Sequence, residues 1–322
     1  MKIKISTPSN FSFRRTVMSH GWYALPPFEF DNEKWTLVRV IDLGSAKPVT
    51  VTISETKHGV LDGTQAPGLL TMGRQARRLR TQLLVDSSRR VGKRAEEKIV
   101  RDVRHMFRLD EDMSIFYAAV SQQPEFAWIA KQGAGRLLRS PTVFEDLVKM
   151  ICTTNCSWAL TEKMVNSLVN ELGHESDDGR KSFPTPQVMA LKTEKFYRDK
   201  IRSGYRAPYL KELAQRVASG ELNVESWLHA ELPHDQFMKE LKGVKGVGNY
   251  AAENLLKLLG RYDGLALDSW TRAQFAKLRS PGRKASDKKI ARFYSSFKSW
   301  RGLALWCDMT RDWLEPERIG DA

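Results

Sequence analysis

The chain has 322 residues, of which 41% are hydrophobic and 10% aromatic; this is enough apolar material for two or three globular domains and excludes a disordered chain. Its 52 Lys and Arg outnumber its 38 Asp and Glu, so the formal net charge is +14, which favours a polyanionic partner such as nucleic acid. Charge alone does not separate that partner from a basic protein that is merely soluble.

The cysteines and the apolar segments indicate which cellular compartment suits the protein. Cys152, Cys156 and Cys307 are too few for a disulfide framework, and no further Cys or His pair follows at the spacing of a zinc site. No apolar run reaches the roughly eighteen residues of a membrane span, and the N-terminal segment does not resemble a signal peptide. We therefore expect a soluble intracellular protein.

Residues 1 to about 70 have the composition of β-strands. Residues 35–42 and 48–53 are rich in β-branched side chains with partial alternation, which predicts two strands. Gly44 lies in the connection between them, so the pair is expected to form a hairpin. Residues 59–68 are predicted to form a loop.

A basic segment connects this region to a helical one. Residues 74–94 contain eight basic residues and one acid, a pattern typical of a solvated face that also suits contacts with a phosphate backbone. The sequence predicts a β-rich domain over 1–105, which includes this segment, and a helical domain over 106–322. Helices are predicted around 144–151, 160–169, 186–200, 207–219, 234–241, 251–259, 286–297 and 302–314, with a loop over 174–186.

Residues 244–252 are the most informative stretch of the chain. Gly246 and Gly248 predict a tight turn, because glycine adopts positive φ at little cost, and the spacing that follows predicts a helix. Such a turn presents backbone N–H groups, which suits a phosphate. Asp268 follows Gly248 by twenty residues in an otherwise uncharged run. We interpret the turn as a DNA contact and Asp268 as a residue that takes part in the reaction. The structural alternatives are an ordinary glycine turn for the first and a helix N-cap for the second.

Five segments, taken in order, resemble the helix-hairpin-helix DNA glycosylase superfamily, and its 8-oxoguanine and 3-methyladenine branches in particular. The resemblance implies an α+β fold, with an N-terminal antiparallel β-sheet domain and a two-lobed, mainly helical domain whose catalytic cleft lies between the lobes. It also implies that the partner is double-stranded DNA containing a modified base, and that the protein acts on it as a monomer without cofactor or metal. The expected location is then cytoplasmic and nucleoid-associated in a bacterium, or nuclear in a eukaryote. The segments are residues 138–141 with 151–155, residues 183–186, residues 204–209, the hairpin over 244–250, and Asp268.

The hairpin is implied by the resemblance to grip the DNA backbone through Lys245, Gly246, Val247 and Gly248. The two glycines allow close approach to a phosphate, and the lysine adds positive charge. The family commonly has proline where this chain has Lys245, so the turn is expected to be less rigid here.

A second group of DNA contacts is implied at Asn155, Tyr205 and Arg206. The asparagine corresponds to the residue that enters the base stack, the tyrosine to a wedge, and the arginine to a residue near the unpaired opposite base. Alternatively, Asn155 caps the helix that follows and Tyr205 is a surface turn residue. Leu160 stands where the oxoguanine branch has an arginine, which argues against recognition of an opposite cytosine.

Asp268 corresponds to the acid of the family. A carboxylate at this place stabilises an oxocarbenium-like sugar and can orient or deprotonate water. Bifunctional members carry a nucleophilic lysine two residues after the second hairpin glycine, but that position is Tyr250 here, and a phenol cannot form an imine. The resemblance therefore predicts a monofunctional hydrolase without AP-lyase activity.

The base pocket is implied to contain Tyr250, Asn254 and Trp306, although a tryptophan at this spacing also suits a helix core. Gly302 replaces a glutamine of the oxoguanine branch, and no iron–sulfur motif follows Cys307. We predict hydrolytic excision of a damaged or modified base, an alkylated purine or another modified base, from duplex DNA. The alternatives are a bifunctional 8-oxoguanine-type glycosylase/AP lyase with a displaced lysine, and a catalytically silent hairpin DNA-binding protein.

Overall fold

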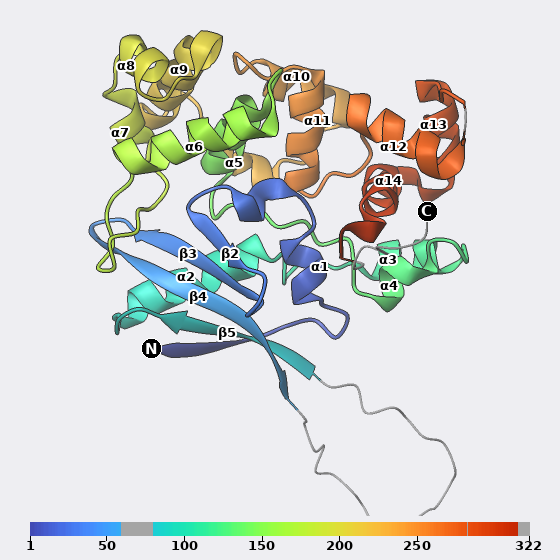
Figure 1. The fold of residues 1–322 in the computed structure, drawn as a ribbon, viewed down its shortest axis with the longest axis horizontal. Coiled ribbons are helices and arrows are strands. Elements are labelled where there is room, and N and C mark those ends of the chain that lie inside the picture. Colours follow the sequence, from blue (N-terminus) through green and yellow to red (C-terminus); the bar gives the residue numbers. More distant parts are fainter. Residues whose placement is uncertain (59–79, 282, 315–322) are drawn as a thin grey trace, which may run out of the picture.

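The computed structural model describes residues 1–58, 80–281 and 283–314, which form one β-sheet and two helical lobes (Figure 1). The predicted loop over 59–68 and residues 74–79 of the basic segment lie outside the described residues. No helix of the described part of the chain is long and apolar enough to cross a membrane. The α+β fold predicted from the sequence is confirmed.

The sheet has five antiparallel strands in the order β1-β5-β4-β3-β2. The predicted hairpin is the β3–β4 pair, in which Leu37 faces Ile53, and both side chains are fully buried. The connection passes through Gly44, whose φ of +77° belongs to the left-handed region that glycine tolerates. The strands are β1 (Lys2–Ser6), β2 (Phe28–Asp31), β3 (Thr36–Leu43), β4 (Ala46–His58) and β5 (Arg80–Ser87).

Strand β5 was not predicted, and it shows that the middle of the basic segment is part of the sheet. Leu83 and Val85 lie on either side of the partly buried Leu84 and are themselves fully buried against the neighbouring strands. The sequence did not predict this strand, because its apolar run is short and the arginines on either side favour a solvent-exposed segment. Lys93 and Arg94, at the end of the segment, are exposed as expected.

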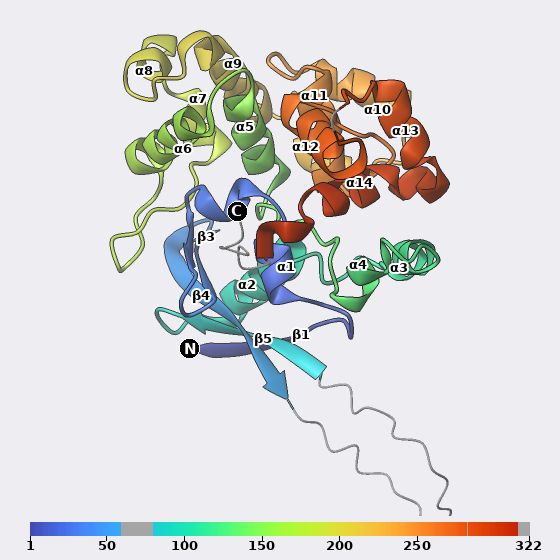
Figure 2. The ribbon, with the colours of Figure 1, turned by 45° about the vertical axis from the view of Figure 1, so that its right-hand side comes forward.

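Two helical lobes stand side by side above the sheet (Figure 2). One contains α5 to α9 and the other α10 to α14, and helix α3 packs against η4 of the second lobe. The α-helices are α1 (Phe13–Val17), α2 (Lys93–Met106), α3 (Ser114–Ser121), α4 (Ala127–Lys131), α5 (Val143–Thr153), α6 (Trp158–Leu172), α7 (Pro186–Ala190), α8 (Glu194–Asp199), α9 (Ala207–Ala218), α10 (His234–Lys242), α11 (Asn249–Leu258), α12 (Ser269–Arg279), α13 (Asp287–Phe293) and α14 (Arg301–Met309). The 3₁₀ helices are η1 (Gly21–Ala24), η2 (Gly204–Arg206), η3 (Val224–His229), η4 (Ser295–Trp300) and η5 (Arg311–Leu314).

Capping residues explain where several helices begin and why one prediction was wrong. Thr142, Ser157 and Thr185 each accept a hydrogen bond from a backbone N–H of the first turn of the helix that follows. The single helix predicted over 186–200 is two helices, because Thr193 starts α8 with its own cap. Ser157, not Asn155, caps α6, so the alternative role given to the asparagine is also wrong.

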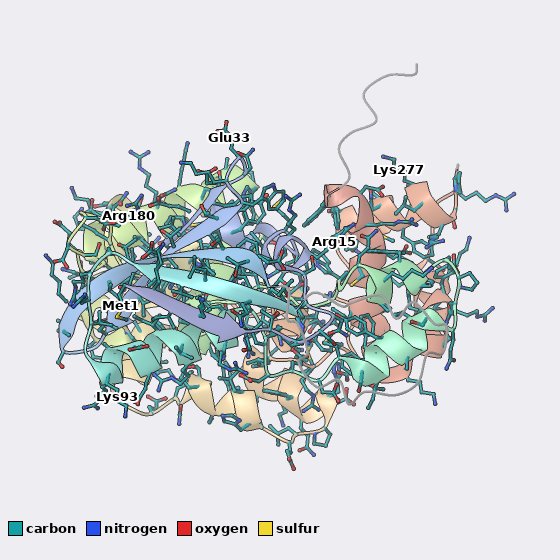
Figure 3. The ribbon with its side chains drawn as sticks, turned by 90° about the horizontal axis from the view of Figure 1, so that it is seen from below. Met1, Arg15, Glu33, Lys93, Arg180 and Lys277 are labelled. Carbon is teal, nitrogen blue, oxygen red and sulfur yellow. The ribbon has the colours of Figure 1, made fainter. Side chains whose placement is uncertain are left out.

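Buried polar contacts join the sheet to the first lobe. Arg39 of β3 forms two hydrogen bonds of 2.6–2.8 Å with Glu145 of α5, and Lys149 lies 2.7 Å from the same carboxylate. Burial raises the pKa of Glu145, but the two cations more than offset it and lower that pKa to about 2. Arg180, in the loop after α6, pairs with Glu29 of β2 at 3.0 Å, and it lies on the same side of the molecule as Lys93 when seen from below (Figure 3).

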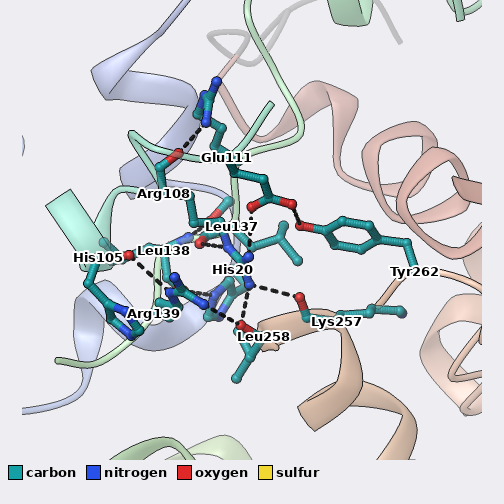
Figure 4. Close-up of polar contacts among 12 residues, drawn as sticks. His20, His105, Arg108, Glu111, Leu137, Leu138, Arg139, Lys257, Leu258 and Tyr262 are labelled. Carbon is teal, nitrogen blue, oxygen red and sulfur yellow. Dashed lines mark hydrogen bonds and ion pairs between the residues drawn. The ribbon is translucent and has the colours of Figure 1, made fainter. Parts of the chain in front are cut away.

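The second lobe is attached through the guanidinium of Arg108, which follows α2 and is almost fully buried (Figure 4). It donates to the carbonyl oxygens of Leu137 at 2.9 Å and Lys257 at 2.8 Å. It also donates to the carbonyl of Leu258 and to the carboxylate of Glu111, the latter at 2.8 Å. The last carbonyls of a helix have no partner within it, so this guanidinium satisfies the C-terminus of α11.

Arg108→Met is expected to lower the free energy of unfolding by about 3–5 kcal/mol, because it leaves buried carbonyls and the Glu111 carboxylate without their partner. Urea denaturation followed by circular dichroism measures this loss. Arg104→Met is the matched control, since Arg104 pairs with Asp110 at the surface, and a loss below about 1 kcal/mol is expected there. Equal losses in the two variants would contradict the importance of the buried guanidinium.

Candidate active site

The predicted hairpin joins α10 to α11 through residues 243–248. Gly246 has a φ of +90°, and a Cβ there would lie 2.8 Å from the Tyr209 ring, so both backbone and space require glycine. Gly248 differs from our expectation, because its φ is −86° and it is the N-cap of α11. A Cβ at Gly248 would meet no atom within 4 Å, so its backbone is open to approach from outside.

The hairpin presents positive charge and free donors. The first backbone N–H groups of α11 have no partner within the helix, and no side chain of the described residues caps them, so they suit an anion. Lys245 is exposed and pairs with Glu212 of α9 at 2.6 Å. Val247 is buried, so this residue fixes the turn to the core while its neighbours stay accessible.

Asp268 is the N-cap of α12. Its Oδ1 accepts hydrogen bonds from the backbone N–H of Thr271 at 2.7 Å and from the Thr271 hydroxyl at 2.8 Å. The capping alternative considered from the sequence is therefore correct, and it leaves the rest of the carboxylate at the wall of a cleft. The loop ahead of it is packed closely: a Cβ on Gly302 of α14 would lie 1.9 Å from the carbonyl oxygen of Gly264, so only glycine fits there.

A cleft of about 1330 Å³ brings the predicted residues together. Its lining includes Asp268, the three residues of the predicted base pocket, the four hairpin residues, and Asn155 with Tyr205. Arg206 is the predicted residue that does not line it. The N-terminal region and both helical lobes contribute residues to its lining.

Asn155 and Tyr205 face each other across the rim of the cleft. Asn155 is exposed, has a φ of +47°, and lies 3.5 Å from the Tyr205 hydroxyl, which is itself on an exposed side chain. Arg206 points inward: it is 3% exposed and donates to the carbonyl of Thr154. Its guanidinium therefore supports the loop that carries Asn155 in this structure, and its contact with an opposite base stays a prediction.

The three residues of the predicted base pocket lie along the cleft near Asp268. Tyr250 is 40% exposed; burial, and then the charge and hydrogen bonding of Asp268, raise its pKa to about 12, so the phenol stays protonated. Asn254 donates to the carbonyl of Tyr250 at 2.9 Å. Trp306 is half-buried and donates its indole N–H to the carbonyl of Ser19 at 2.8 Å.

Sequence reasoning missed several cleft residues. Trp270 and Trp313 are each 39% exposed and lie 5.8–5.9 Å from the Trp306 ring. Lys257 continues the face of α11 that carries Tyr250 and Asn254, at spacings of four and seven residues, and that periodicity could have identified it. The tryptophans come from separate segments, so no local pattern predicts their meeting.

His20 is another cleft residue without a local signal. Its Nε2 contacts the carbonyl of Leu138, and its ring lies 4.9 Å from that of Trp22. Burial lowers its pKa from 6.5 to about 4, and the nearby cations Arg108, Lys149 and Lys257 act in the same direction. The imidazole is therefore neutral at pH 7.

Comparison with known proteins agrees with this arrangement. No protein-family model matches the chain. A DNA-3-methyladenine glycosylase of Bacillus subtilis is 25% identical over 231 residues, which cover 69% of this chain and 76% of that protein. An N-glycosylase/DNA lyase of Saccharomyces cerevisiae is 26% identical over 173 residues, 49% of this chain and 46% of that protein.

Solved structures are similar over nearly the whole chain. The 3-methyladenine DNA glycosylase from Archaeoglobus fulgidus has a TM-score of 0.67 at 19% identity, covering 96% of this chain and 98% of that one. The 8-oxoguanine glycosylase/lyase from Clostridium acetobutylicum has a TM-score of 0.67 at 21% identity, covering 96% and 95%.

These likenesses define the fold as that of a helix-hairpin-helix DNA glycosylase, with its N-terminal sheet and two helical lobes. The curated relatives are DNA glycosylases of the 3-methyladenine and DNA-lyase types. The curated relatives and the similar solved structures are therefore DNA glycosylases of the superfamily that the order of the sequence segments resembles.

The neutral state of His20 predicts a dependence of stability on pH. Its folded pKa is lowered, so the unfolded chain takes up a proton below pH 6.5 that the folded protein binds only near pH 4. The stabilisation is present above pH 6.5 and is lost as the pH falls towards 4. Between pH 7 and 5 this group is expected to cost about 1–2 kcal/mol of unfolding free energy.

Urea denaturation of the wild type and of His20→Gln at both pH values measures that cost. The glutamine variant lacks this titrating group, so its free energy of unfolding should fall less than that of the wild type between pH 7 and 5. The difference between the two falls is the contribution of His20, since other titrating groups affect both proteins alike. Parallel losses would show that His20 does not contribute.

Proposed function

We propose that this protein is a monofunctional DNA glycosylase, which rotates a damaged or modified base out of double-stranded DNA and hydrolyses its bond to the sugar. The observation that carries the proposal is the carboxylate of Asp268 at the wall of a cleft whose rim holds the hairpin. The similarity to DNA-3-methyladenine glycosylase of Bacillus subtilis supports base excision as the reaction.

Binding begins with the phosphates. The N–H groups at the start of α11 and the ammonium of Lys245 offer donors and positive charge at the rim. The exposed pair Asn155 and Tyr205 faces them from the other lobe and suits the hole that an extruded base leaves. Rotation of a base out of the stack costs a few kcal/mol, and contacts of this kind offset that cost.

Hydrolysis then requires a group that stabilises positive charge on the sugar. The Asp268 carboxylate, held by Thr271 through Oδ1, is fixed in place before the substrate binds, so it does not reorganise as the oxocarbenium-like state forms. The same carboxylate can orient water for attack at the sugar carbon. The reaction leaves an abasic site.

The absence of an amine at position 250 supports hydrolysis without strand cleavage. Tyr250 stands there, and its hydroxyl keeps its proton because of burial and the neighbouring Asp268. An imine with the sugar needs a nitrogen nucleophile, which tyrosine lacks.

Asp268→Asn should reduce base release at least about a hundredfold, because it removes the negative charge that faces the sugar. DNA affinity should stay nearly unchanged, and so should stability, since asparagine also caps helices well. Release is measured by mass spectrometry of free bases from a panel of alkylated, oxidised, deaminated and hypermodified duplexes.

Asp287→Asn is the matched control, because this exposed carboxylate pairs with Arg272 at the surface, and full activity is expected. Unchanged release in Asp268→Asn would refute the assigned acid. A wild-type protein that releases no base from the panel would instead be a silent DNA-binding protein.

Borohydride treatment of the protein with abasic DNA should yield no covalent adduct. A trapped adduct would show an imine and favour the bifunctional alternative, with Lys257 as the first candidate nucleophile because it lines the cleft. Tyr250→Lys supplies the positive control, since it places an amine beside Asp268, and adduct formation is expected there.

A further inference from the structure

Lys257 lies at the inner wall of the cleft, beside the tryptophan on which an extruded base would stack. Its side chain is 3% exposed, although it lines the cleft together with Tyr250, Asn254 and Trp306. Its Nζ donates to the carbonyl of Leu265 at 3.2 Å and lies 5.3 Å from the centroid of the Trp306 ring.

The ammonium has no counter-charge in contact with it. Within residues 1–58, 80–281 and 283–314, no carboxylate lies within ion-pair distance of Nζ. Two carboxylates act on it from a distance: Glu253, which accepts from the backbone N–H of Ala266, and Asp268, whose Oδ1 accepts from Thr271.

The remaining groups around Lys257 leave it mostly protonated at neutral pH. Burial lowers its pKa to about 8, while Glu253 and Asp268, and the thiol of Cys307 on α14, act in the opposite direction. Two further groups face it from the N-terminal half of the chain: His20, which is neutral at pH 7, and Arg108, which binds the carbonyl of Lys257 itself.

An aromatic ring attracts a cation because its face carries partial negative charge, and the attraction extends to about 6 Å from the centroid. At Trp306, Lys257 already occupies that range. A positively charged base stacked on the same ring would bring a second cation close to a buried ammonium, where like charges repel strongly. An uncharged base would stack without that penalty and could accept a hydrogen bond from the ammonium.

We propose that Lys257 excludes extruded bases that carry a formal positive charge, so that the pocket selects uncharged modified bases. The proposal rests on the proposed function, because it assumes that a base enters this cleft. It narrows the substrate class from modified bases in general to those without a charge.

Binding to a shape-matched pair of duplexes tests this selection. One carries 3-methyladenine, whose nucleoside is a cation; the other carries its uncharged 3-deaza isostere, and a 2′-fluorine on both sugars slows loss of the base. The dissociation constants are measured by fluorescence anisotropy at pH 7. The wild type should bind the uncharged duplex about tenfold more tightly, and Lys257→Met should bind the two within about threefold.

Lys245→Met is the matched control, since it removes an exposed positive charge from the rim of the same cleft. Both affinities should fall together there, and their ratio should not change. A preference for the uncharged duplex that survives in Lys257→Met would overturn the proposal, and so would equal binding by the wild type.

A pH series on the wild type needs no substitution and covers the case in which Lys257→Met does not fold. The preference should shrink between pH 7 and 9, as the ammonium loses its proton near pH 8, and a flat profile would contradict the role of Lys257. These binding measurements do not depend on catalysis. If the protein shows the preference but releases no base, the proposal for Lys257 stands and the proposed hydrolysis is refuted.

Discussion

The buried guanidinium of Arg108 holds the carbonyl end of α11, and the geometry of the cleft depends on that contact (Figure 4). A helix of ten residues is a rigid rod of about 15 Å, so fixing one end fixes the other. The opposite end carries Gly248 and the free N–H groups of the hairpin. The face between them carries Tyr250, Asn254 and Lys257, so one buried arginine positions both the hairpin end of α11 and the inner wall of the cleft.

Asp268 is subject to a second constraint, because the carboxylate that we propose for the chemistry also caps α12. Its Oδ1 caps α12 through Thr271, which fixes the side chain at the cleft wall without help from a ligand. The loop that leads to it packs against Gly302 so closely that no side chain fits. Fixed geometry of this kind favours electrostatic stabilisation, since a preorganised charge needs no rearrangement during the reaction.

The charges of the cleft are arranged by depth. Positive charge lies at the rim, from Lys245 and the start of α11. The negative charge of Asp268 lies at the cleft wall, and the positive charge of Lys257 lies on the inner wall beside Trp306. Under the proposed function, these three charges would meet the phosphates, the sugar and the base in turn.

The sequence by itself determined the features that depend on local spacing: the glycine turn, the helix after it, Asp268 at its separation from the turn, and tyrosine at position 250. The β3–β4 hairpin was also readable, because alternation and a turn glycine are local signals. The tertiary structure decided the rest. Contacts between distant segments turned Arg206 inward, brought His20 and Trp270 to the same cleft as Trp306, and buried β5 within a basic segment. Such contacts produce no local spacing pattern in the sequence, because the partners lie tens to hundreds of positions apart.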